Sequence, residues 1–223
     1  EKDLLAIDDD AARMHDGIFR RGDHDRLANR KRVVADLAAG ATPVDGENLH
    51  LGPGFVDIHC HAGGQYWAYE NPEAVALHHL KGGSTSMLLT MYHQQTQEEI
   101  LRAAGWIRRA IETGTPGNIA GIHMEGPYVA PSQCGAQDPA YIRNPEDGSY
   151  KLLAGHAAGA IRIWTVAPEL PGAERICEDL KDEGIVFSLG HTAATYEQAK
   201  AYIAGEYGSD KVPSREMTKE EIQ

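Results

Sequence analysis

The chain has 223 residues, with 33 acidic side chains against 21 lysine and arginine side chains, and a formal net charge of −12. This charge repels the phosphates of nucleic acids and leaves no basic face for an anionic membrane. No stretch reaches the roughly 18 apolar residues that a membrane-spanning helix needs. The three cysteines are widely spaced and odd in number, which is typical of a reducing compartment rather than a disulfide framework. We therefore expect a cytoplasmic protein that binds neither nucleic acid nor a membrane.

Residues 1–43 form the least regular part of the chain. They contain an acidic run at residues 8–10 and a mixed-charge stretch that leads into a candidate helix at 26–39. Charge runs of this kind usually form a solvated face or a disordered arm. We interpret the chain as an N-terminal segment at 1–50, a main domain at 51–204 and a C-terminal tail at 205–223.

From residue 55 onward, short apolar runs alternate with helix-like segments. The runs predict strands at 55–60, 84–91, 119–124, 161–166 and 185–190. The segments between them predict helices at 72–81, 97–113, 171–183 and 195–204, and one more within 139–158. This alternation indicates parallel strands joined by right-handed crossovers. The main domain is therefore α/β, a partial (β/α)8 TIM-type barrel with about five of the eight units of a closed barrel.

Two histidines close the first of these strands. His59 and His61 are separated by one residue, and residues i and i+2 of a strand point to the same side. Two imidazoles that project together suit a metal ion, although a plain pair of polar residues at a strand end has the same pattern. Cys60 lies between them and points to the opposite face, so we interpret it as a core-packing thiol rather than a ligand.

Two later strands also end in groups that bind metals. Glu125 follows the run at 119–124, and His191 follows the run at 185–190. A barrel-type metal hydrolase requires metal-binding side chains at the carboxyl ends of separate strands. The histidine pair, the glutamate and the later histidine meet this requirement. The expected cofactor is a divalent metal ion, with zinc favoured, although these ligands also suit iron, manganese or cobalt.

Several of these segments are similar to those of a known family. The matching pieces are residues 53–61, 123–128, 135–137, 165–169 and 188–199, in the family's order, over roughly residues 44–204. On these segments the chain resembles the amino-sugar-phosphate deacetylases of the amidohydrolase superfamily. The histidine pair occurs across the superfamily, whereas His-Met-Glu-Gly-Pro and Gly-His-Thr are more specific to the deacetylases.

The resemblance implies a metal-dependent hydrolase of amino-sugar catabolism. Its reaction would cleave the acetamide of N-acetylglucosamine 6-phosphate to give glucosamine 6-phosphate and acetate. Glu125 and His191 match the family's metal ligands, and His59 with His61 match the pair that holds a second metal in some members. The resemblance also places a substrate loop against the acetamido group, and this loop consists of Gly135, Ala136 and Gln137.

Parts of the family pattern have no counterpart in this sequence. The resemblance places a catalytic aspartate on an eighth strand and a further histidine ligand on the strand after His191. We therefore identify no catalytic residue, and interpret Asp57 as structural. We expect an incomplete chain that stops before the sixth barrel strand, with residues 1–50 as a disordered segment or a remnant of the family's small β-sandwich. Weak activity or none is expected from it alone, and the resemblance suggests a homodimer.

Two other interpretations stay open. One is a different amidohydrolase that acts on a cyclic or aryl amide, and the other is a half barrel without catalytic activity. Many relatives of the first kind bridge their metals with a carboxylated lysine, yet Lys81 and Lys151 both lie outside the predicted strands.

Several other residues near the predicted site have uncertain roles. His93 could line it, and His123 is expected to pack inside the barrel or to support Glu125. Glu169 could be a structural acceptor or a substrate contact. His78 and His79 are expected to be surface or helix-packing residues.

Overall fold

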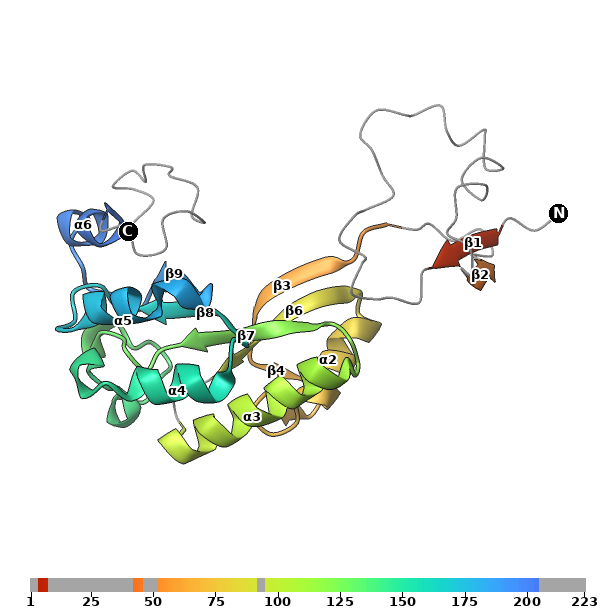
Figure 1. Ribbon diagram of the computed structural model, residues 1–223, viewed down its shortest axis with the longest axis horizontal. Coiled ribbons are helices and arrows are strands. Elements are labelled where there is room, and N and C mark those ends of the chain that lie inside the picture. Colours follow the sequence, from red (N-terminus) through yellow and green to blue (C-terminus); the bar gives the residue numbers. More distant parts are fainter. Residues whose placement is uncertain (1–3, 8–41, 46–51, 92–94, 205–223) are drawn as a thin grey trace, which may run out of the picture. The chain divides into compact units, whose positions relative to one another are not determined.

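The computed structural model describes residues 4–7, 42–45, 52–91 and 95–204 (Figure 1). The chain divides into two compact units, Glu1–Phe55 and Val56–Gln223. In the first unit, β1 (Leu4–Ile7) and β2 (Thr42–Asp45) pair as antiparallel strands. The sequence pattern did not indicate these strands, and the helix expected at 26–39 lies outside the described residues.

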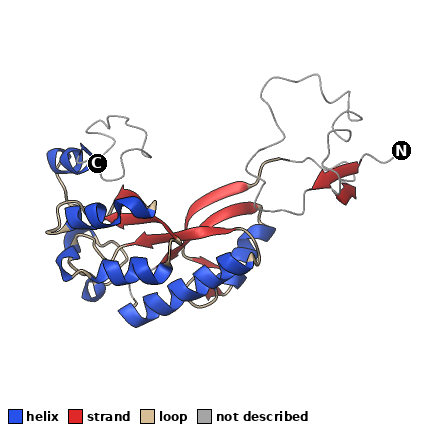
Figure 2. Ribbon diagram, in the orientation of Figure 1, coloured by secondary structure: helices blue, strands red, loops and turns tan. Residues whose placement is uncertain are grey.

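The second unit contains one sheet of five strands in the order β3-β6-β7-β8-β9. These strands are β3 (Phe55–Cys60), β6 (Ser84–Met91), β7 (Ile119–Glu125), β8 (Ile161–Val166) and β9 (Val186–Leu189). The pairs from β6 to β9 are parallel. Helices follow the strands in the expected alternation (Figure 2). The predicted fold class, a partial TIM-type barrel, is therefore confirmed.

Five α-helices accompany this sheet. They are α2 (Pro72–Lys81), α3 (Gln97–Thr113), α4 (Ser149–Ala157), α5 (Ala173–Leu180) and α6 (Tyr196–Ala204). Local capping explains why α3 begins and ends where the sequence predicts. Thr96 and Glu99 form a reciprocal capping box, and Gly114 ends the helix with a left-handed φ of 63°, a conformation that costs glycine little.

The connections contain short elements that the sequence did not indicate. A hairpin of β4 (Ala62–Gly63) and β5 (Tyr66–Trp67) follows His61. Three 3-10 turns, each beginning at a proline, precede α4, and they are η3 (Pro131–Gln133), η4 (Pro139–Tyr141) and η5 (Pro145–Asp147). The helix predicted within 139–158 is therefore short, and α5 is extended only by the 3-10 turn η6 (Lys181–Glu183).

The core lies between the sheet and the helices that cover one of its faces. Trp164, Ile122 and Ile107 are fully buried. Strands β7 and β8 approach closely at Gly121, where a Cβ atom would lie 2.7 Å from the carbonyl oxygen of Ala160. A larger residue there would separate the two strands.

Strand β3 differs from the centre of the sheet because both of its faces are open. Phe55 is 71% exposed, Val56 67% and Ile58 55%. Apolar side chains on an edge strand that remain this exposed are uncommon in stable monomers. Among the described residues, no helix combines the length and apolar character needed to cross a bilayer.

Candidate metal centre

The four residues predicted as metal ligands meet at the carboxyl end of the sheet. His59 lies near the end of β3 and His61 directly follows that strand, Glu125 is the last residue of β7, and His191 follows β9. Parallel strands direct their carboxyl ends to the same edge. The sheet therefore brings together residues that are up to 132 positions apart, from His59 to His191.

The carboxylate of Glu125 is the centre of this cluster. Its Oε2 atom lies 3.0 Å from Nε2 of His61, and its Oε1 atom lies 3.0 Å from Nε2 of His191 and 3.6 Å from Nε2 of His59. The Nε2 atoms of His59 and His61 are 3.1 Å apart. All three imidazoles therefore turn the same ring nitrogen toward one carboxylate.

Charge in this cluster resides on the carboxylate. Burial raises the pKa of Glu125, but hydrogen bonds with His61 and His191 and the charge of His59 outweigh burial and bring this pKa down to about 2. Burial lowers the pKa of His59, and the neighbouring Glu125 only partly opposes this effect. An ionised carboxylate is the protonation state that metal binding requires of Glu125.

The hydrogen bond that His191 makes through Nδ1 leaves its Nε2 atom suited to bind a cation. Its Nδ1 atom lies 2.9 Å from the carbonyl oxygen of Gln133. A carbonyl only accepts, so Nδ1 carries the proton and, in the neutral ring, Nε2 presents a lone pair to Glu125. Two lone pairs 3.0 Å apart need a proton or a metal ion between them. A ligand histidine that donates its other N–H to a carbonyl is the usual arrangement at metal sites.

The donor set also matches a metal site in number and type. His59, His61 and Glu125 each offer one ligand atom, and these atoms lie within 4.8 Å of one another. Two or three imidazoles with one carboxylate form the ligand set of many catalytic zinc sites, which keep one position open for water. The residues present therefore fit a divalent ion.

His123 supports this cluster from the buried interior, which is one of the two roles that the sequence led us to expect. Its Nδ1 atom lies 2.8 Å from the carbonyl oxygen of Ile58, and its Nε2 atom lies 2.8 Å from the hydroxyl of Thr165. Its ring also contacts His59, with the two Nδ1 atoms 3.3 Å apart. His123 therefore connects β7 to β3 and β8 and restricts the position of His59.

Glu169 holds the turn that carries His191. Its carboxylate accepts hydrogen bonds from the hydroxyl of Thr192 at 2.5 Å and from the backbone N–H of Ala193 at 2.6 Å. His191 has a φ of 51°, a left-handed conformation that is strained for a residue other than glycine. The surrounding hydrogen bonds compensate for this strain. Of its two expected roles, Glu169 has the structural one in this structure.

The predicted substrate loop lies beside the same cluster. Gln137 is buried, and its Nε2 donates to the backbone carbonyl of Glu125 at 3.3 Å. Its Oε1 atom has no hydrogen-bond partner among the described residues. Gly135 contacts the ring of His191, since a Cβ atom there would lie 3.5 Å from Cε1. The contact of Gly135, Ala136 and Gln137 with substrate stays a prediction.

The remaining candidates have different outcomes. Asp57 accepts a hydrogen bond from the backbone N–H of His59 at 3.0 Å, in agreement with a structural role. His93 lies outside the described residues. The sequence indicated His123 and Glu169 as candidates without deciding their roles. Their contacts depend on the register between strands, which a short sequence motif does not specify.

Comparisons with known proteins agree with this fold and site. No family model matches the chain. The chain is 34% identical over 152 residues to the N-acetylglucosamine-6-phosphate deacetylase of Bacillus subtilis (strain 168), covering 64% of this chain and 38% of that protein. It is 27% identical over 200 residues to the N-acetylgalactosamine-6-phosphate deacetylase of Escherichia coli O157:H7, covering 87% of this chain and 49% of that protein.

A similar solved structure is that of a mutant N-acetyl-D-glucosamine-6-phosphate deacetylase from Mycobacterium smegmatis in complex with N-acetyl-D-glucosamine-6-phosphate. The TM-score is 0.64 at 33% identity, over 69% of this chain and 40% of that chain. A half barrel that gathers histidine and glutamate side chains at its carboxyl end has the architecture of a barrel-type metal hydrolase. Over this part, the chain is similar to N-acetylglucosamine-6-phosphate deacetylases. The chain spans less than half the length of these relatives.

Proposed function

We propose that this chain carries the metal centre of a deacetylase that hydrolyses the acetamide of N-acetylglucosamine 6-phosphate to glucosamine 6-phosphate and acetate. The observation that supports this most is the arrangement around Glu125. His191 donates through Nδ1 and presents Nε2 to the carboxylate at 3.0 Å. This arrangement is expected of a ligand pair, and it occurs in a chain whose relatives are named for this reaction.

His59, His61, Glu125 and His191 would hold the ion. When bound, a divalent ion would act as a Lewis acid that polarises a water molecule and the amide carbonyl. Zinc is the metal we favour. Four proposed ligands at three strand ends are enough to bind either one ion or two. The chain's own part is to orient the imidazoles of His59 and His191, through His123 on one side and the carbonyl of Gln133 on the other.

Gln137 is proposed to recognise the acetamido group. Its Nε2 donates to the backbone of Glu125, which fixes the amide next to the cluster and leaves its buried Oε1 without a partner among the described residues. A buried acceptor in this state is costly unless a ligand satisfies it. The acetamide N–H of the sugar is a donor that could do so, with Gly135 and Ala136 as the adjoining loop surface.

Proton transfer to the leaving amine needs a general acid. Among the described residues, Glu125 is the carboxylate that contacts these imidazoles, and as a ligand it would be occupied. We therefore propose that this chain by itself binds the metal well and releases acetate slowly or not at all. A homodimer is a further prediction, suggested by family resemblance.

The test is acetate release from N-acetylglucosamine 6-phosphate by the purified chain with zinc supplied, together with bound zinc after dialysis. Bound zinc that is lost in Glu125→Gln would support the metal centre whether or not acetate appears. A chain that keeps no zinc, or whose zinc is unaffected by Glu125→Gln, would contradict the proposal. Acetate release that depends on Glu125 would show that these five strands suffice for turnover.

A second substrate is favoured by one comparison. The relative from Escherichia coli O157:H7, which aligns with 87% of this chain, is named for N-acetylgalactosamine 6-phosphate. The two sugars differ only in the orientation of one hydroxyl group, and the acetamide is the same. Measuring both substrates side by side with the zinc-loaded chain would separate them. Failure of both, with zinc bound, would favour a different amide or a half barrel without activity.

A further inference from the structure

A second group of metal-ligating side chains lies behind the candidate metal centre. Asp57, Cys60 and His79 each offer one ligand atom, and these atoms lie within 4.8 Å of one another. Cys60 is adjacent to His59 in the strand and faces the opposite side, whereas Asp57 alternates with His59 and still brings a carboxylate oxygen within this distance. His79 belongs to α2, which places this group between the edge strand and its helix.

The distances within this group are those of ligands rather than of loose neighbours. Sγ of Cys60 lies 3.2 Å from Nε2 of His79. Sulfur and nitrogen bound to one tetrahedral zinc ion would be about 3.5 Å apart, given bond lengths of about 2.3 and 2.0 Å. The carbonyl oxygen of Ala62 lies 2.9 Å from the same nitrogen and 3.5 Å from the sulfur.

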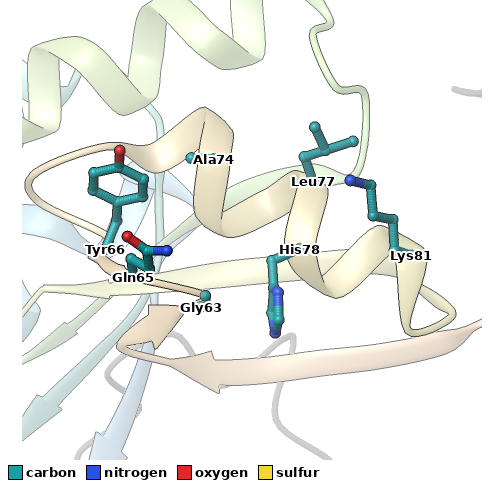
Figure 3. A pocket seen from close by; sticks show the side chains of 8 residues that line it. Gly63, Gln65, Tyr66, Ala74, Leu77, His78 and Lys81 are labelled. Carbon is teal, nitrogen blue, oxygen red and sulfur yellow. The ribbon is translucent and has the colours of Figure 1, made fainter.

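The β4–β5 hairpin approaches His79 closely at Gly63, where a Cβ atom would lie 3.0 Å from Nε2 of His79. Gly63 is also in the wall of a pocket between the β4–β5 hairpin and α2, where Tyr66 and His78 form other parts of the wall (Figure 3). Glycine at this position therefore allows the hairpin to lie close to the imidazole without a clash.

We propose that Asp57, Cys60 and His79 form a second metal site, selective for a thiophilic divalent ion such as Zn²⁺ or Cd²⁺. Binding replaces the Cys60 S–H bond with a sulfur–metal bond, and the proton leaves to solvent. His79 binds through Nε2, so its proton moves to Nδ1 and its hydrogen bond to Ala62 is given up. One oxygen of Asp57 is the third ligand, and water completes the tetrahedron.

This ion would fasten the edge strand to its helix. Strand β3 is the most exposed strand of the sheet, because Phe55, Val56 and Ile58 have little cover and only Cys60 at its end is buried. A metal that joins Cys60 of β3 to His79 of α2 binds the folded chain and not the unfolded one, and so stabilises the fold. The site shares no ligand with the cluster around Glu125, so the two can be tested separately.

Cobalt titration of the metal-free, reduced full chain tests this site, because thiolate bound to Co²⁺ gives a near-ultraviolet charge-transfer band that imidazole and carboxylate do not. We expect the band in the unaltered chain and in Glu125→Gln. We expect Cys60→Ser to lose it, and His79→Gln to weaken the affinity measured by it at least tenfold, since even residues behind the ligands cost 10- to 100-fold.

Cys134→Ser is the matched control, because Cys134 is also a free cysteine but is not part of the group. Circular dichroism of each variant checks that it is folded, and the His79 variant tests the site without altering any cysteine. The inference is wrong if the unaltered chain gives no band at saturating cobalt. It is equally wrong if the band survives Cys60→Ser, or disappears in Cys134→Ser instead.

Discussion

The centre and the edge of the sheet contribute to the candidate metal centre in different ways. Ile122 of β7 is fully buried, whereas Ile58 of β3 is 55% exposed. The same contrast holds for the ligands, since the side chain of Glu125 is 13% exposed and that of His59 is 40% exposed. Packing fixes the carboxylate, while hydrogen bonds across strands fix the imidazole. The site therefore combines an anion on a rigid strand with ligands on a strand that has little packing of its own.

The largest expected effect is on the stability of the central strand. Ile122→Ala should lower the free energy of unfolding by about 2 to 5 kcal/mol, because it removes fully buried methyl groups and leaves a cavity. Urea unfolding monitored by circular dichroism measures this loss. A loss below about 1 kcal/mol would mean that β7 is not packed as tightly as described.

The second prediction concerns the carboxylate that the central strand holds. Glu125→Gln should reduce zinc affinity at least about 100-fold, because it removes the charged ligand that all three imidazoles face. Isothermal titration with zinc in a Cys60→Ser background, which lacks the thiol of the second proposed site, is the measurement. Glu112→Gln is the matched control, since Glu112 lies exposed on α3 with a side chain that is 59% accessible. Equal zinc affinities for Glu125→Gln and Glu112→Gln would show that Glu125 is not a metal ligand.

The third prediction concerns the turn after β9. Glu169→Ala should lower zinc affinity by about 10- to 100-fold, because it releases the bonds that hold His191 in its left-handed conformation. Glu169→Gln keeps an acceptor oxygen for one of these bonds and should lose less. Zinc titration of both variants, with acetate release in parallel, distinguishes them. Identical affinity for Glu169→Ala and the unaltered chain would show that His191 is positioned without this carboxylate.

The smallest expected effect is at the edge. Ile58→Ala should change the free energy of unfolding by less than about 1 kcal/mol, because more than half of this side chain is exposed before the change. The same urea experiment serves here, and the difference from Ile122→Ala measures the contrast between edge and centre directly. A loss as large as that of Ile122→Ala would mean that β3 is covered in solution.

Much of the main domain could be predicted because its signals are local. Strands 84–91 and 161–166 and helices 72–81 and 97–113 have the predicted bounds. Caps such as Asn71, whose side chain accepts from the N–H of Ala74 at 3.0 Å, lie within a few residues of the boundary they set. The convergence of the four predicted ligands was also predictable, because parallel strands have a common carboxyl edge.

The rest depends on contacts between residues distant in sequence. The bond from Thr192 to Glu169 spans 23 residues, and that from His123 to Ile58 spans 65. Their formation depends on the register between neighbouring strands and on how turns are placed, which periodicity does not specify. The contact of Cys60 with His79 is of the same kind, whereas the burial of Cys60 in the core follows from strand alternation and confirms the sequence prediction.

The strand order of the sheet has a consequence for how the chain folds. Each strand of the five-stranded sheet pairs with the strand that follows it within that sheet, from β3 to β9. Ordering one more unit therefore requires closure of only one strand–helix–strand connection at a time, as in repeat proteins. During synthesis each unit can dock on its predecessor soon after it emerges from the ribosome. The histidine pair of β3 would then be in place first, and the last imidazole would arrive only when β9 is added.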